Sequence, residues 1–434
     1  DLDTFMAAAA GENLEATVVA EVSADPRLVM YWRGEKIVDI SRAFLDTNGI
    51  SQETSVEVEG IDAASPFNEV PAAVAGRKDI REAWLANLDR LNVCSEEGLG
   101  ERFDGTIGRG TVLMPYGGRR QLTPTEAMAA RLPVLGGKTN ATSVMACGYN
   151  PNVACWSPYH GGMYAVVEAV CRAAAVGADT TKLRLSMQEY FPKLHNPAKW
   201  GLPLSALLGA YNACCQLELP AIGGKDSMSG TFMDLEVPPS LLCFAVGVMD
   251  GRDTISSEFK KAGNEVIFVP VPCDEHEVVD FEALKKLLAS VHKGILGRRI
   301  ITAGVVKEGG VAASLSAMCL GNGLGFAFVK PFLHEECLFT LQPGGFLVEL
   351  APDADAAAVF EGTDYLPLGR LTDDARITVN DTEISLKDIE SAYTRTLDST
   401  FPQKVRNTEK KNIREVPFHN DLPLTAPYNV AKPR

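Results

Sequence analysis

The chain has 434 residues, of which 46% are apolar and 22% charged, and its formal net charge is −15 at pH 7. The length predicts about three domains or domain pieces, and the composition is that of a globular protein able to bury sizeable cores. The acidic balance argues against a nucleic-acid-binding protein, which needs a basic surface. The sequence lacks both the run of about 18 uncharged apolar residues of a membrane-spanning helix and the pattern of a signal peptide, so we expect no membrane association.

The ten cysteines are scattered, with no Cys-x-x-Cys pair and no cluster of cysteine with histidine. Several of them fall within apolar helical patterns, where cysteine serves as a small core residue. This usage is typical of a reducing compartment. We therefore expect a cytoplasmic protein without disulfides or a zinc site.

In chain order, the first feature is a weak internal repeat between residues 18–41 and 367–389. Each segment gives a strand of small residues, a Ser/Thr-x-Asp-x-Arg sequence, a second strand, a polar turn, a third strand and an Asp before a helix. The repeat predicts that residues 1–60 form the tail of one unit, and that the equivalent segment closes a second unit near residue 395.

Residues 61–104 are predicted to form a helical connector, with Trp84, Leu85, Leu88 and Leu91 along its apolar stripe. Residues 105–250 then alternate strands and helices. The predicted elements are a helix over 162–176, a strand at 183–187, a helix whose stripe is Leu204, Leu207, Leu208, Tyr211 and Cys215, a short strand at 220–222 and a buried strand at 241–249.

Residues 251–397 are predicted to form a second domain. It contains a strand at 265–271, a helix at 281–292, a strand at 300–306, a Gly309-Gly310 turn and a helix at 311–319. Residues 398–434 are rich in lysine, arginine and proline, which is typical of a linker.

Two loops carry a Gly-Gly-Lys sequence: VLGGKTNATS at 134–143 and AIGGKDSMSG at 221–230. Neither is a Walker A motif, because Leu132 stands where the first needs its leading glycine, and Asp226 replaces the Ser or Thr of the second. No Gly-x-Gly-x-x-Gly dinucleotide fingerprint follows a strand. The sequence therefore argues against both a P-loop nucleoside triphosphatase and a dinucleotide-binding fold.

A Gly-Gly-Lys loop can still bind phosphate. Two glycines let backbone N–H groups approach an anion, lysine supplies a positive charge, and Asp and Ser can hold a metal ion or a hydroxyl group. The alternative interpretation is that each loop is a strand-end turn with a lysine on the surface. The residues alone leave both interpretations open.

The order of motifs resembles a known family. GGKTNATSVMACGYNPNVACWSPYHGGMYAVVEAVCRAAAVGAD is followed by a strand and then by LPAIGGKDSMSG. This order is similar to that of the phosphoribosylformylglycinamidine synthases, and the resemblance covers essentially the whole chain. Its most specific parts are the Ser-Pro-Tyr-x-Gly-Gly helix start and the Pro-x-x-Gly-Gly-Lys-Asp-Ser-Met-Ser sequence.

The resemblance implies an α/β (α+β) architecture. The family's synthetase region contains two tandem units like aminoimidazole ribonucleotide synthetase, which form a pseudo-dimer, and a glutaminase domain follows in the long form. Each unit pairs an N-terminal sheet-forming domain with a C-terminal α/β domain. The implied divisions are 1–60 as the tail of the first unit's C-terminal domain, 61–104 as connector, 105–250 and 251–397 as the two domains of the second unit, and 398–434 as a linker toward the glutaminase.

The implied partners are the first synthetase half and the glutaminase domain of the same full-length chain. Without the first half, an apolar sheet face would be exposed, so we expect the isolated chain to self-associate as a homodimer.

The family reaction converts formylglycinamide ribonucleotide, ATP and glutamine to formylglycinamidine ribonucleotide, ADP, phosphate and glutamate, which makes the family ATP-dependent carbon–nitrogen ligases that use Mg²⁺. The resemblance implies that Gly223, Gly224, Lys225, Asp226 and Ser227 bind nucleotide and substrate. Gly224 would contact the nucleotide through its backbone and Ser227 the substrate phosphate or ribose, while Lys225 stands where short forms place a metal-binding Asn. The catalytic histidine and metal carboxylates would lie in the other half, so none of the six histidines here is expected to be the general base and the isolated chain is expected to be inactive.

The family also binds a second, non-reacting nucleotide with magnesium. Its four ligands fall near Gly136, Glu168, Arg172 and Val305 in this chain, and of these only Glu168 remains a possible metal ligand. Arg172 and Lys307 would repel Mg²⁺ and would instead pair with Glu168 or Glu308.

We therefore expect an altered auxiliary site, neutralised by lysine rather than metal. Its expected members are Gly137, Lys138, Thr139, Asn140 and Glu168. The alternative is a structural ion pair between Glu168 and Arg172, which are four residues apart on one helix.

Two alternatives for the whole chain remain. The chain can be a non-catalytic scaffolding half of the pseudo-dimer. It can also be another ATP-using member of the superfamily, of the selenophosphate synthetase or thiamine-monophosphate kinase type, which should show a self-contained, carboxylate-rich metal site.

Overall fold

The computed structural model describes residues 1–403 except 48–52, 62, 104 and 107. The chain divides into two compact units, the first formed by residues up to Thr54 and the second beginning at Ser55. Each unit is described by itself.

The first unit consists of a helix, a hairpin and a short helix: α1 (Leu2–Gly11), β1 (Arg27–Trp32), β2 (Glu35–Ser41) and α2 (Arg42–Thr47). Strands β1 and β2 pair in antiparallel register. None of residues 1–47 is buried, although Tyr31, Trp32 and Ile37 are large and apolar. These residues thus form no core of their own. The same is expected of the tail of a larger domain.

The internal repeat corresponds to a shared local structure. In the second unit, β17 (Arg376–Val379) and β18 (Thr382–Ser385) also form an antiparallel hairpin that leads directly into a helix, α11 (Leu386–Asp398). There, Ile377, Ile384 and Ile389 are fully buried. The same hairpin-and-helix sequence is therefore packed into a domain in one copy and exposed in the other.

The second unit begins with the connector and a small antiparallel pair of strands. Its elements are α3 (Ile80–Leu88), α4 (Glu97–Gly100), β3 (Tyr116–Gly117) and β4 (Thr123–Pro124). Trp84 of α3 is fully buried, and its indole Nε1 donates to Ser316 Oγ at 2.8 Å. The expected stripe is wrong at one residue, because the helix ends at Leu88 and Leu91 is 68% exposed. The connector thus packs into the core of the C-terminal domain.

A five-stranded sheet follows, in the strand order β5-β6-β11-β7-β8, with all pairs antiparallel except β7–β8. Its strands are β5 (Met128–Arg131), β6 (Ala141–Gly148), β7 (Arg184–Tyr190), β8 (Ala221–Ser227) and β11 (Ser240–Asp250), and its helices are α5 (Pro151–Trp156), α6 (Pro158–Ala175) and α7 (Pro197–Leu217). A short hairpin of β9 (Thr231–Phe232) and β10 (Leu235–Glu236) lies between β8 and β11.

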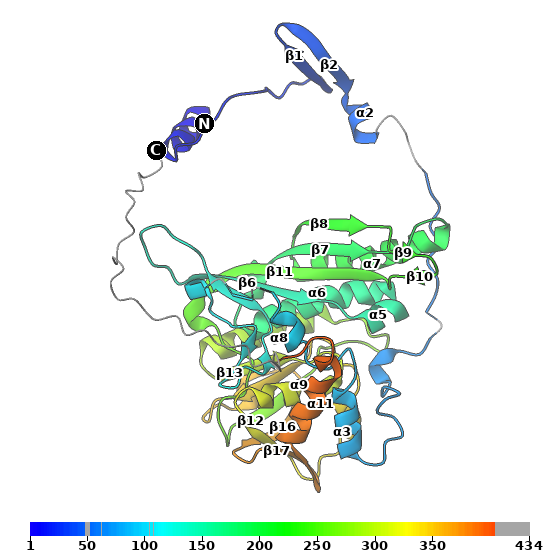
Figure 1. The fold of residues 1–434 in the computed structure, drawn as a ribbon, viewed down its shortest axis with the longest axis vertical. Coiled ribbons are helices and arrows are strands. Elements are labelled where there is room, and N and C mark those ends of the chain that lie inside the picture. Colours follow the sequence, from blue (N-terminus) through cyan, green and yellow to red (C-terminus); the bar gives the residue numbers. More distant parts are fainter. Residues whose placement is uncertain (48–52, 62, 104, 107, 404–434) are drawn as a thin grey trace, which may run out of the picture. The chain divides into compact units, whose positions relative to one another are not determined.

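Helix α6 lies between this sheet and the C-terminal domain (Figure 1). Ser157 caps it by accepting a hydrogen bond from the backbone N–H of His160, and Pro158 occupies its first position, both of which favour a helix start. Gly162 allows α7 to approach closely, since a Cβ atom there would lie 2.1 Å from the carbonyl oxygen of Ala206.

The predicted apolar stripe of α7 faces away from the core. Small residues, among them Ala206, Gly209 and Ala210, are buried, whereas the large apolar residues Leu207 and Tyr211 are 53% and 65% exposed. The reason is the close approach to α6, which leaves no room for large side chains on the inner face.

One face of the five-stranded sheet carries no helix among the residues of this unit that the structure describes. The cross-strand register places six apolar residues on it, which we call the open face: Met128, Met145, Leu242, Phe244, Val246 and Val248. Of these, Val248 is 58% exposed and Met128 41% exposed. The open face is therefore an apolar surface at one end of the second unit.

The C-terminal domain is built on a seven-stranded sheet of order β13-β15-β12-β16-β14-β17-β18. Its remaining strands are β12 (Glu265–Val269), β13 (Ile300–Val305), β14 (Gly325–Phe328), β15 (Phe346–Leu350) and β16 (Leu366–Thr372), and its remaining helices are α8 (Phe281–Leu296), α9 (Gly310–Leu320) and α10 (Ala356–Val359). The two sheets with their helices confirm the expected α/β class. The predicted linker from 398 lies almost entirely outside the described residues.

Candidate functional site

The second Gly-Gly-Lys sequence lies within an edge strand. We expected a loop after a short strand, but β8 continues through Gly223, Gly224, Lys225 and Asp226 to Ser227 and is almost wholly exposed. A bulge at Ile222 shifts its register against β7. The register then places Lys225 opposite Gln188 and Ser227 opposite Tyr190, on the open face.

Gly224 is required by strand packing. A Cβ atom at this position would lie 2.3 Å from the carbonyl oxygen of Met187 on β7, and backbone atoms cannot give way as a flexible side chain can. The glycine therefore lets β8 lie close against β7 and so fixes the position of the neighbouring Lys225.

The side chain of Lys225 is held above an aromatic ring. Its Nζ atom lies 5.0 Å from the ring centroid of Tyr190, a distance at which the ring attracts a cation. The hydroxyl group of Tyr190 donates to Gln188 Oε1 at 3.0 Å, which fixes the ring. The ammonium group is thus positioned at the edge of the open face and accessible to an anion.

The remaining two polar residues of the sequence point to different faces. Asp226 pairs in register with Glu189 on the face opposite Lys225, and burial together with the charge of Asp226 raises the pKa of Glu189. Ser227 Oγ lies 3.4 Å from Ser229 Oγ. In the part of the chain that the structure describes, no group of three or more His, Cys, Asp or Glu side chains is placed to hold a metal ion.

The first Gly-Gly-Lys sequence forms part of the loop between β5 and β6. Gly137, Lys138 and Asn140 are exposed or nearly so, and Thr139 Oγ1 accepts a hydrogen bond from the backbone N–H of Ala141 at 3.0 Å. The loop therefore has the features of an ordered strand-end turn with a lysine on the surface.

Glu168 lies far from this loop. It packs beside Gly148, at the opposite end of β6, where a Cβ atom added to the glycine would lie 3.1 Å from the Cβ atom of Glu168. The length of β6 separates the two ends by roughly 20 Å or more. The structure therefore does not bring Gly137, Lys138, Thr139 and Asn140 together with Glu168, as the predicted auxiliary site requires.

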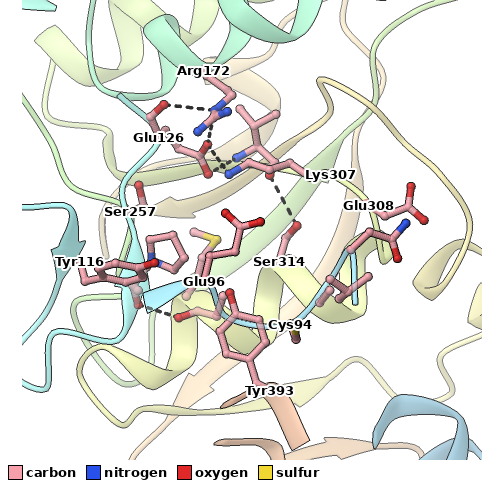
Figure 2. Close-up of a pocket in the computed structure, with 18 residues that line it drawn as sticks. Cys94, Glu96, Tyr116, Glu126, Arg172, Ser257, Lys307, Glu308, Ser314 and Tyr393 are labelled. Atoms are coloured by element: carbon pink, nitrogen blue, oxygen red, sulfur yellow. Dashed lines mark hydrogen bonds and ion pairs between the residues drawn. The ribbon is translucent and has the colours of Figure 1, made fainter. Parts of the chain in front are cut away.

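Glu168 belongs instead to an ionic cluster through its pair with Arg172. Three members of this cluster, Glu126, Arg172 and Lys307, line a cavity of about 290 Å³ between the sheet-forming and C-terminal domains (Figure 2). The centre of the cluster is Glu126, which the sequence analysis missed. Glu126 Oε2 lies 2.9 Å from Lys307 Nζ and 3.0 Å from Arg172 Nε, and Oε1 accepts from the backbone N–H of Val305 at 3.1 Å.

The predicted i,i+4 ion pair between Arg172 and Glu168 is found, at 3.9 Å, but the predicted partner of Lys307 needs correction. Arg172 also binds Glu126, and more closely, and it donates to the carbonyl oxygen of Cys147 at 2.7 Å. Lys307 pairs with Glu126, whereas Glu308 forms an ion pair with Arg90. The predicted neutralisation by lysine therefore involves a carboxylate that the resemblance did not indicate.

The pKa values of the two carboxylates in the cluster are shifted in opposite directions. Burial acts to raise the pKa of Glu126, but the charges of Lys307 and Arg172 outweigh it and hold that pKa below its usual value. Burial raises the pKa of Glu168 to about 7, because its nearest cation is more distant. Glu126 is thus the carboxylate of the pair whose ionised form the two cations favour.

His160 is a structural residue. Its Nε2 atom lies 3.0 Å from the carbonyl oxygen of His276 and must donate to it, so its Nδ1 atom accepts from Ser157 Oγ at 2.7 Å. Both ring nitrogens are therefore used, which agrees with the prediction that His160 is not a general base.

Stability should depend on pH through His160. Burial lowers its pKa below 6.5, although Asp274 opposes this shift. A histidine that stays neutral in the fold and protonates when unfolded stabilises the fold above pH 6.5, and this stabilisation is lost as the pH falls toward the folded pKa. We expect His160→Gln, which keeps a donor for His276, to flatten the fall in unfolding free energy between about pH 7 and about pH 5 by up to roughly one proton per molecule. Denaturant titrations at several pH values measure this slope, and equal slopes for the two proteins would contradict the assignment.

No helix in the part of the chain that the structure describes is long and apolar enough to cross a membrane. The ten cysteines are free thiols in the structure.

Comparisons with known proteins identify relatives of this chain. No protein-family model matches it. The phosphoribosylformylglycinamidine synthase subunit PurL of Thermoplasma acidophilum is 22% identical over 400 residues, which cover 87% of this chain and 51% of that protein. The corresponding subunit of Methanosarcina barkeri is 23% identical over 419 residues, which cover 91% and 56%. The chain thus spans about half the length of the curated relatives it matches.

Solved structures agree in fold. PurL of Thermotoga maritima complexed with ATP matches with a TM-score of 0.50 at 18% identity, covering 85% of this chain and 53% of that one. The same protein complexed with FGAR gives a TM-score of 0.55 at 15% identity, covering 74% and 55%. The fold is therefore that of the aminoimidazole-ribonucleotide-synthetase-like proteins. The chain is thus similar to PurL subunits both in sequence and in fold, in agreement with the resemblance found in the sequence.

Proposed function

We propose that this chain is the second half of the synthetase region of a phosphoribosylformylglycinamidine synthase and supplies one side of its nucleotide and substrate cleft. The observation that carries the proposal is the placement of Lys225 and Ser227 on an exposed edge strand, beside the apolar open face of the sheet. Binding groups at the rim of an uncovered apolar face are what one half of a composite site would present.

In the proposed site, the open face receives the sheet of a preceding synthetase half. Gly224 brings the backbone of β8 to the nucleotide, Lys225 neutralises phosphate charge and Ser227 donates a hydrogen bond to substrate phosphate or ribose. These groups position the reactants, and charge neutralisation accounts for much of the catalysis in phosphoryl transfer.

The catalytic base and the metal carboxylates belong to the other half in this proposal. The described residues support that division, since they offer no metal-binding cluster and since His160 is committed to two structural hydrogen bonds. The full enzyme would use ATP with Mg²⁺ and take ammonia from a glutaminase domain in the cytoplasm.

A purely scaffolding role is the alternative. It is favoured by the structural use of Gly224 for strand packing and by the contact of Lys225 with Tyr190, since both features also stabilise the sheet edge. The two functions differ in what they predict for the lysine and serine side chains.

Substitutions in the full-length enzyme separate the two. We expect Lys225→Met and Ser227→Ala to lower kcat/KM about 10- to 100-fold each, the size of effect expected for a charged or hydrogen-bonding contact to the reacting phosphates. Lys138→Met is the matched control, because Lys138 follows two glycines in the other loop, and it should change kcat/KM by less than about twofold. Steady-state kinetics that leave both β8 variants equal to the control would favour the scaffold.

A further inference from the structure

The resemblance implies a metal-bound nucleotide between the two domains of this unit, but the residues found there do not fit one. We propose that the buried cluster of Glu126, Lys307, Arg172 and Glu168 joins the sheet-forming and C-terminal domains without a divalent metal, and that the adjacent cavity takes no Mg²⁺–nucleotide complex. This inference does not depend on the proposed function of β8.

Glu126, the carboxylate that lines the cavity beside both cations, is already fully engaged. One oxygen of Glu126 binds the two cations at 2.9 Å and 3.0 Å, and the other accepts the N–H of Val305. Mg²⁺ requires a near-octahedral set of oxygen ligands at about 2.1 Å. Binding it here would require the removal of Lys307 and Arg172 from their partner.

The charge balance points the same way. The cluster contains two cations, Arg172 and Lys307, and two carboxylates, of which Glu126 is ionised while the pKa of Glu168 is raised to about 7. Its net charge near neutral pH therefore lies between zero and one positive charge. The side chain of Glu126 is only 6% exposed and that of Glu168 only 8%. A divalent cation would add two uncompensated positive charges in this buried setting, which is strongly unfavourable.

The acidic residue next to Lys307 is not available to restore a metal site. Glu308 forms an ion pair with Arg90 and accepts a hydrogen bond from Asn152 Nδ2 at 3.1 Å. The position corresponding to the last metal ligand is Val305, whose side chain is apolar and whose backbone N–H is bound by Glu126.

The cluster also links parts of the chain that are distant in sequence. Glu126 precedes β5 and Arg172 lies on α6, both in the sheet-forming domain, whereas Val305 and Lys307 lie at the end of β13 in the C-terminal domain. The ion pair of Glu126 with Lys307 therefore crosses the domain boundary, where a bound metal would otherwise bridge the two sides (Figure 2).

Thermal unfolding of the 434-residue chain tests the proposal. We expect the Tm of the wild type to be unchanged, within about 1 °C, by EDTA and by Mg²⁺ with ADP, since a ligand that binds the folded state raises Tm. A rise in Tm with Mg²⁺ and ADP, or heat of binding in isothermal titration calorimetry, that is retained in Lys225→Met, which removes the nucleotide contact proposed for β8, would overturn the proposal.

Substitutions test the ionic joint itself. Lys307→Met should lower Tm by roughly 5–10 °C, because it leaves Glu126 with one cation fewer in a buried site. The double variant Glu126→Gln with Lys307→Met should regain at least half of that loss, and Lys307→Arg should retain most of the wild-type Tm. Lys330→Met removes an exposed ion pair with Asp381 at 2.6 Å and is the control, with an expected change below about 2 °C.

Equal losses of Tm for Lys307→Met and Lys330→Met would contradict the proposal that the cluster joins the two domains. Losses of Tm that simply add in the double variant would contradict it too. If Lys307→Met does not fold, the comparison of Lys307→Arg with the double variant and the calorimetry of the wild type still decide the proposal.

Discussion

Gly224→Ala should lower kcat/KM of the full-length enzyme about 100-fold, the effect expected when catalytic groups are misplaced by about 1 Å. The added methyl group would lie 2.3 Å from the carbonyl oxygen of Met187, and contacts this short do not occur between a real Cβ atom and its neighbours. Strand β8 must therefore move away from β7. Because Lys225 is held against Tyr190 by this pairing, the strand shift displaces the lysine from the cleft.

Gly137→Ala is the matched control for this substitution. Gly137 occupies the equivalent place in the other Gly-Gly-Lys sequence, but a Cβ atom there meets only ordinary contacts, the nearest at 3.7 Å from a side chain of Val134. The control should keep both activity and Tm. Steady-state kinetics and hydrogen exchange of the β8 amides measure the two effects, and equal kinetics in the two alanine variants would show that close packing of β8 does not position the site.

The sequence predicted elements well where one periodicity dominated. The helix expected at 162–176 is found as α6, and the strand expected at 241–249 is found as β11. Both are buried elements in which apolar residues recur at a regular spacing. The division into domains that the resemblance implied stays a prediction.

The predictions failed where packing between elements decides the outcome. The large apolar residues of α7 face outward because α6 approaches its glycine and alanine face, and a count of apolar residues does not show how closely two helices pack. The Gly-Gly-Lys sequence at 223–225 was expected to be a loop. It lies within strand β8 instead, because Gly224 permits a close strand pair.

Glu126 illustrates why part of the site escaped prediction. Its bonds to Arg172 and to the backbone of Val305 span 46 and 179 residues of sequence, so no local pattern reveals them. The sequence did indicate that Arg172 and Lys307 needed anionic partners. Which carboxylate meets them depends on how the sheet-forming domain lies against β13, and only the fold supplies that information.

Division of one active site between two halves is the central claim, and it predicts the largest effect of all. In the proposed site this chain provides the phosphate-facing edge strand. Its described residues provide no metal-binding cluster, and His160 is committed to two structural hydrogen bonds. The chain alone should therefore form no detectable product, whereas catalysis should appear when the complementary half covers the open face.

The most direct measurement is product formation from formylglycinamide ribonucleotide, ATP and an ammonium salt, which removes the need for a glutaminase. The 434-residue chain is assayed alone and after mixing with a separately expressed preceding half of a PurL-type synthetase. We predict that the chain alone forms no formylglycinamidine ribonucleotide and that the mixture forms it in an ATP-dependent reaction. The rate of that reaction should fall when the chain carries Lys225→Met. Turnover by the chain alone, at a rate unaffected by the added half, would contradict this prediction.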